Sequence, residues 1–100
     1  MLIGFSGVML SGTGSNAYRA FLDVSIDGTR IGGDDGLISH YGPYTANASF
    51  TVITSALSAA SHIIKLQWKV SNVANTTTMY AGAGTSAADI HPRFWGIELL

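Results

Sequence analysis

Three histidines and a few aspartates are the side chains in this sequence that suit proton transfer or metal binding. His40, His62 and His91 are not paired at the spacing of a metal site, and no HExxH run is present. Asp89 and His91 place a carboxylate two residues from an imidazole, but the GxSxG turn of many serine hydrolases is absent. The sequence therefore predicts no catalytic residue and no enzyme, with a small carbohydrate-active hydrolase kept as an alternative.

The glycine-rich stretch at residues 32–44 is the best candidate for binding, because loops on a rigid scaffold often carry binding residues. Asp34 and Asp35 could offer oxygens to calcium, but the spaced acidic series of an EF-hand is missing, so no metal site is predicted. Tyr41 and Tyr44 flank Gly-Pro and offer surface for a sugar or a protein. Asp34, Asp35, Tyr41 and Tyr44 are the predicted binding residues.

The composition excludes several classes of protein. Only 11% of the 100 residues are charged and 47% are hydrophobic, so part of a small domain's surface must be apolar, which favours an oligomer. A net charge of −1 argues against binding to nucleic acid. The absence of cysteine excludes disulfides and thiolate metal sites, and we expect no cofactor. No apolar run approaches about 18 residues, so no membrane insertion is expected, and the N-terminus lacks the basic region of a secretory signal.

Residues 62–70 (HIIKLQWKV) alternate apolar and polar side chains, which is typical of a half-buried strand. This alternation predicts that Leu66, Trp68 and Val70 face the core. Residues 17–26 alternate in the same way, with positions 18, 20, 22, 24 and 26 on the inner face and a polar outer face interrupted by Phe21.

Turn signals divide the chain into short β-rich runs, and Asp27-Gly28 predicts a two-residue hairpin. Residues 55–61 could form one helical turn. Strands are expected at residues 2–10, 17–26, 29–31, 37–41, 48–54, 62–70, 76–81 and 93–99. The immunoglobulin sandwich competes, but its Cys–Trp–Cys core is absent. We therefore predict a single domain over residues 1–100, an all-β, eight-stranded antiparallel jelly-roll sandwich.

Three segments of the second half carry a resemblance to a known family. They are residues 57–69 (LSAASHIIKLQWK), residues 80–84 (YAGAG) and residues 89–100 (DIHPRFWGIELL), with Ala60-Ser61 where the family pattern has a glycine. Together they resemble the C-terminal jelly-roll domains of bacteriophage tail-fibre and other virion proteins, which are similar in plan to tumour-necrosis-factor-like trimers.

The resemblance implies a non-enzymatic virion protein that forms a homotrimer and acts as a structural or receptor-binding module at a tail-fibre tip. Its partners would be other copies of itself and either virion proteins or a host cell-surface glycan. A capsid decoration (cement) protein is the alternative within the same class.

Overall fold

The computed structural model describes residues 1–11, 19–41, 45–71, 77–79 and 91–99. These residues build an all-β structure without a helix, so the expected helical turn at residues 55–61 does not form. No helix in the described ranges is long and apolar enough to span a membrane. The strands are β1 (Leu2–Ser11), β2 (Arg19–Ile26), β3 (Thr29–Arg30), β4 (Ile38–Tyr41), β5 (Thr45–Ile53), β6 (Ile64–Val70), β7 (Thr77–Met79) and β8 (Arg93–Ile97).

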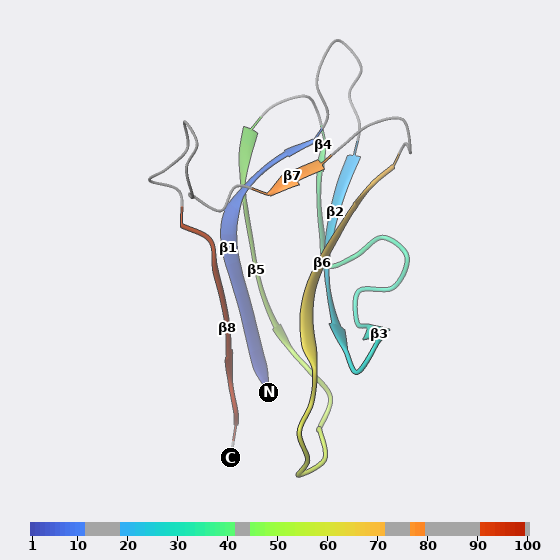
Figure 1. Ribbon diagram of the computed structural model, residues 1–100, viewed down its shortest axis with the longest axis vertical. Coiled ribbons are helices and arrows are strands. Elements are labelled where there is room, and N and C mark those ends of the chain that lie inside the picture. Colours follow the sequence, from blue (N-terminus) through green and yellow to red (C-terminus); the bar gives the residue numbers. More distant parts are fainter. Residues whose placement is uncertain (12–18, 42–44, 72–76, 80–90, 100) are drawn as a thin grey trace.

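The strands form two antiparallel sheets, each organised around one central strand (Figure 1). In sheet A, β1 pairs with β5 on one side, while β7 and β8 share its other side. In sheet B, β2 pairs with β6 on one side, while β3 and β4 share its other side. The eight strands match the eight expected from sequence, and their ends differ by three residues or fewer within the described ranges.

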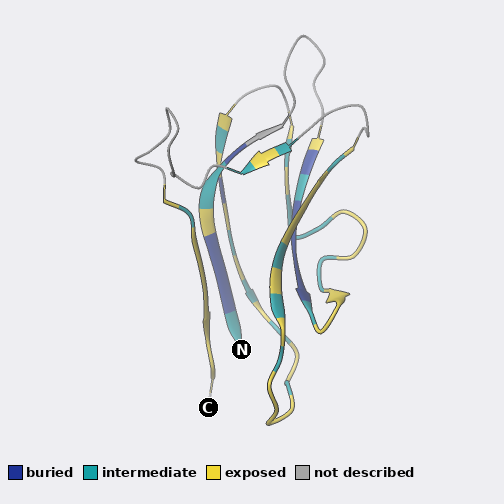
Figure 2. Ribbon diagram, in the orientation of Figure 1, coloured by how far each residue is buried: buried dark blue, intermediate teal, exposed yellow. Residues whose placement is uncertain are grey.

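The hydrophobic core lies between the two central strands, as the dark segments of β1 and β2 show in Figure 2. Alternate residues of each strand point inward, so apolar side chains from both sheets meet. The buried cluster contains Phe5, Met9, Ala20, Leu22 and Ala48. Ala20, Leu22 and Val24 are fully buried, which confirms the inner face predicted for this strand.

The Asp27-Gly28 hairpin between β2 and β3 is confirmed. Both residues have positive φ angles, 52° and 87°, as a two-residue type I′ turn requires. Such a turn matches the right-handed twist of the flanking strands, so Ile26 pairs directly with Thr29.

Trp68 is less buried than its sequence position predicts. It pairs with Leu22 and so lies on the inner face of sheet B, but the residue is 46% exposed. The physical reason is that β6 is an edge strand, paired only with β2 among the described residues. Leu66 beside it is half-buried and packs against the core cluster. Alternation in the sequence thus predicted correctly which face of sheet B Trp68 occupies, but not how far its side chain is buried.

Candidate functional site

The outer face of sheet B carries a group of polar side chains that are held by hydrogen bonds and an ion pair, among them Asp23, Arg30 and Lys69. Residues 31–37 fold back along β2, because the Ile31 amide donates to the Val24 carbonyl (2.9 Å) and the Leu37 amide donates to the Leu22 carbonyl (2.8 Å). Gly33 and Gly36 allow this path, with φ of 68° at both. The loop therefore stands over a face that the sequence predicted to be open and polar.

Asp23 lies under this loop and is only 5% exposed. One carboxylate oxygen, Oδ1, accepts hydrogen bonds from the amides of Val24 (2.7 Å) and Gly32 (2.9 Å) and so anchors the loop to β2. The other oxygen, Oδ2, is shielded from solvent and has no hydrogen-bond partner among the described residues. A buried carboxylate oxygen without a donor costs free energy, so this atom is an acceptor that a donor would stabilise.

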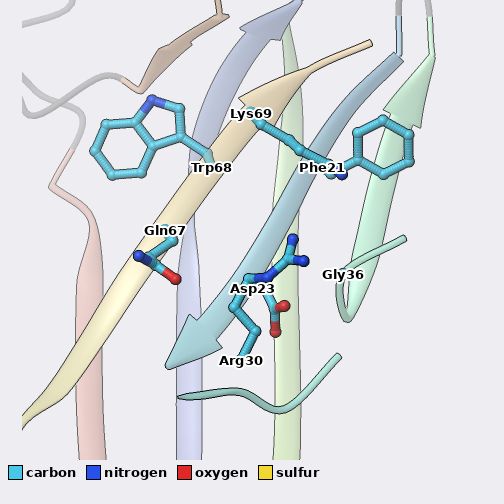
Figure 3. Close-up of a pocket in the computed structure, with 7 residues that line it drawn as sticks. All are labelled: Phe21, Asp23, Arg30, Gly36, Gln67, Trp68 and Lys69. Atoms are coloured by element: carbon cyan, nitrogen blue, oxygen red, sulfur yellow. The ribbon is translucent and has the colours of Figure 1, made fainter. Parts of the chain in front are cut away.

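A hollow of about 210 Å³ opens beside Asp23 (Figure 3). Its polar lining comes from Arg30, Gln67 and Lys69, and Phe21 and Gly36 also line it. In sheet B, Phe21 pairs with Lys69 and Asp23 pairs with Gln67, so these four side chains stand on one face by register. Trp68 borders the hollow, but its ring points to the opposite side of β6 from Lys69 and Phe21 in Figure 3.

Lys69 and Arg30 are both tied to Asp34 at the rim of the hollow. The Lys69 ammonium donates to the Asp34 carbonyl (2.6 Å) and lies 5.0 Å from the centre of the Phe21 ring. Arg30 Nη2 lies 3.2 Å from Asp34 Oδ1, in an ion pair with an almost fully exposed carboxylate. Exposed pairs of this kind contribute little to stability, so Arg30 is free to change position.

The predicted binding residues do not form one site. Asp34 and Asp35 lie in the loop over β2, before β4 begins, and both are exposed. Tyr41 lies at the other end of β4, 64% exposed, with the Arg19 guanidinium 5.7 Å from its ring centre. Tyr44 falls outside the described residues. The structure thus separates Tyr41 from the acidic pair, but leaves both on the side of sheet B away from the core.

No group of three or more potential metal ligands occurs within the described ranges. The carboxylate of Asp34 contacts Arg30, and the loop carbonyl of Asp34 accepts from Lys69. Two cations at this position disfavour a calcium ion. His40, His62 and His91 lie in three separate places, in β4, before β6 and before β8.

His62 bridges two loops at one end of the molecule. Its Nδ1 lies 2.7 Å from Asp27 Oδ2, and its Nε2 lies 3.0 Å from the Ser58 carbonyl oxygen and 3.4 Å from Ser58 Oγ. The hydrogen bond to Asp27 raises the pKa of His62, and the Ser58 carbonyl adds to the effect. The hydrogen bond from His62, together with the hydrogen bond from the Ile63 amide, lowers the pKa of the Asp27 carboxyl group.

The three residue types resemble a Ser–His–Asp arrangement, but the geometry differs in one respect. Nε2 would have to accept a proton from Ser58 Oγ, whereas here it donates to the nearer carbonyl oxygen. In this geometry Nε2 is directed to the Ser58 carbonyl oxygen (3.0 Å) more closely than to Ser58 Oγ (3.4 Å), which does not suit activation of that hydroxyl. His62 is therefore a hydrogen-bonded residue that lies two positions before β6.

Asp89 lies outside the described residues, and His91 is exposed in the segment before β8. Sequence reasoning missed the hollow because its residues come from β2, β3, the loop and β6. The one available signal was alternation, which places Phe21 and Asp23 on the same face and Gln67 and Lys69 on the same face. Alternation does not tell which strands are neighbours, so it could not predict that these two pairs of side chains lie side by side.

Comparison with known proteins gives no relative: no protein-family model matches the chain, and no curated protein or solved structure matches it either.

Proposed function

We propose that this chain is a non-enzymatic, jelly-roll β-sandwich subunit of a homotrimer, acting as a structural or receptor-binding module of a virion. The observation that carries the proposal is an exposed apolar surface, termed here the β6–β8 side. It comprises Trp68 of β6 and the C-terminal residues Phe94, Trp95, Ile97 and Leu99, each at least 39% exposed. These side chains lie on or next to β6 and β8, and several large exposed apolar side chains on a chain with few charges are typical of a protein–protein interface.

The edge of β8 supports this assignment. All five residues of β8 are exposed, and β8 pairs only with β1 among the described residues (Figure 2). Edge strands of monomers usually carry charges or proline that block pairing with other chains. Here Phe94, Trp95, Gly96 and Ile97 stand in a row, with charge only at the flanking Arg93 and Glu98. An exposed strand edge of this composition is expected to pack against another protein chain.

The β6–β8 side also contains an opening into the core. A cavity of about 130 Å³ lies between the sheets, lined by Ile3, Ile64 and Phe94 with neighbouring Trp95 and Gly96. Residues on inner-facing positions of β6 and β8 therefore remain partly uncovered. Packing of another copy here would bury apolar area from both sheets at once, and cyclic symmetry would cover one such side per subunit.

A binding function, as opposed to catalysis, is supported by His62, because both of its ring nitrogens form hydrogen bonds within the fold. The trimer and the virion setting are supported by the resemblance of the second half of the sequence to phage tail-fibre domains. Tyr41, exposed at the end of β4, remains a proposed contact residue for a receptor.

The experiment is measurement of mass in solution by sedimentation equilibrium or light scattering. The expected result is three times the 10.5 kDa chain mass. Ile97→Lys is expected to dissociate the trimer, because a charge would enter the β6–β8 side. Ile53→Lys is the matched control, since Ile53 and Ile97 flank Leu2 on opposite sides of β1. A monomeric parent chain, or equal effects of the two variants, would refute the proposed interface.

A further inference from the structure

The hollow on the outer face of sheet B contains a buried polar side chain, Asp23, in its lining. Oδ1 is used by two amides of the fold, whereas Oδ2 has no donor among the described residues although the residue is 95% buried. Protein interiors rarely leave such an oxygen unpaired. A ligand that donates a hydrogen bond to Oδ2 would remove this cost.

Charge narrows the class of ligand. Arg30 and Lys69 bring two positive charges to the hollow, and Asp23 and Asp34 bring two negative charges, so the formal charges cancel. An anionic ligand would meet the Asp23 carboxylate, and a cationic ligand would meet Arg30 and Lys69. A purely apolar ligand would leave Oδ2 unpaired. What remains is a neutral molecule rich in hydroxyl donors.

The remaining walls suit a sugar ring. The Phe21 ring and the methylene stem of Lys69 offer apolar surface, on which the C–H face of a pyranose packs. Gln67 lies directly across from Asp23 on β6, and its amide is able to donate to one hydroxyl and accept from another. A volume of about 210 Å³ is smaller than that of a typical drug-sized pocket, so the hollow suits one monosaccharide unit.

We propose that this hollow binds one pyranose unit of a neutral saccharide, with a hydroxyl donating to Asp23 Oδ2 and a second hydroxyl bound by Gln67. Because Oδ2 is shielded in the free protein, binding requires a side chain of the lining to shift, and Arg30 is the candidate. Its weak, exposed pair with Asp34 permits that shift. The assignment deepens the proposed receptor-binding function and rests on it, and it places the saccharide unit beside residues 31–37, apart from the proposed contact at Tyr41.

The experiment is saturation-transfer difference NMR of the full chain with glucose, galactose, mannose and N-acetylglucosamine. N-acetylneuraminic acid serves as the anionic probe. The expected result is saturable binding of at least one neutral sugar, with a dissociation constant of roughly 1 mM, as a shallow site with few hydrogen bonds allows. Weaker binding of the anionic sugar is also expected. Tighter binding of the anionic sugar, or no neutral sugar bound at millimolar concentration, overturns the proposal.

Asp23→Asn tests the key oxygen, because it retains the Oδ1 acceptor and replaces the unpaired oxygen by a donor. Gln67→Ala tests the second contact at an exposed position where folding is not at risk. Each variant is expected to weaken binding about tenfold, the value of one hydrogen bond. Lys65→Ala is the control, since Lys65 lies on the same face of β6 outside the hollow.

Unchanged binding in both variants overturns the assignment. Solution mass is measured on the same samples, so that the two proposals fail separately. Trimers that bind none of the sugars overturn the saccharide site alone, whereas monomers that bind a neutral sugar through Asp23 overturn the trimer alone.

Discussion

Gly4→Ala is expected to release Trp95 from sheet A and destabilise the protein by about 2 kcal/mol. Gly4 lies on β1 directly opposite Trp95 of β8, and the indole covers it so closely that an added Cβ would overlap the benzo ring. The Gly4 backbone cannot move aside, because β5 and β8 hold β1 on both edges. The indole must therefore give way.

The magnitude follows from burial. Trp95 is 39% exposed, so about 60% of the roughly 250 Å² of an indole side chain is covered. At about 25 cal/mol per Å², full release costs at most about 4 kcal/mol, or about 3 kcal/mol for a compact denatured state. Alanine is intrinsically better than glycine in a strand by about 0.5–1 kcal/mol, which leaves a net loss of about 2 kcal/mol.

Urea denaturation of three variants tests this reasoning. Gly96→Ala is the control, because a Cβ there would come no closer than 3.4 Å to any neighbouring atom (Met1 Sδ), and little loss is expected. Trp95→Ala removes the ring, so adding Gly4→Ala to it should cost nothing further, a coupling that a double-mutant cycle measures. If Gly4→Ala costs the same with and without the indole, or no more than Gly96→Ala, the indole does not rest on Gly4.

Leu22→Ala is expected to lower the free energy of unfolding by about 2–5 kcal/mol, because this side chain is fully buried. Trp68→Ala should lower it by about 2 kcal/mol, because Trp68 is 46% exposed. Denaturant melts that give the reverse order would contradict the placement of β6. Gly28→Ala should lose about 1 kcal/mol through its φ of 87° alone, since no atom lies near the added Cβ, and an unchanged melting temperature would exclude the type I′ turn. The pKa of His62 is raised in the folded protein, so its contribution to stability is full below the usual pKa of 6.5 and is lost as pH rises through the folded-state pKa. The pKa of Asp27 is lowered, so its contribution is full above the usual pKa of 3.8 and is lost as pH falls through the folded-state pKa. The contribution of this pair to the melting temperature should therefore be largest between about pH 4 and 6.5, and His62→Gln should weaken the decline above that range; identical pH profiles of variant and parent would contradict the bridge.

Local patterns in the sequence were enough to place the strands. Alternation marked the inner face of β2, and Asp27-Gly28 marked the hairpin, because backbone conformation and side-chain parity depend on neighbours in the chain. Low charge likewise indicated apolar surface, and β8 bears much of it.

The candidate site was harder to predict, because its residues come from separate strands. The sequence placed Asp34, Asp35 and Tyr41 in one loop region, but β4 separates the acidic pair from the tyrosine. Asp23 was expected on a solvated face, and it became buried because the Gly32 amide bonds to its carboxylate.

Periodicity along one strand determines which side chains share a face, since that depends only on backbone geometry. How deeply a side chain is buried depends on what lies beside and above its strand. Trp68 and Leu22 have the same inward parity, but Leu22 is on a central strand and Trp68 on an edge strand, so the first is buried and the second half exposed. The sequence by itself determined the all-β class, the strand positions and the turn between β2 and β3. Only the tertiary structure decided that Asp23 faces Gln67 beneath a loop and that β6 and β8 are edge strands among the described residues. The reason is that strand pairing joins residues far apart in the chain, such as Asp23 with Gln67 and Gly4 with Trp95.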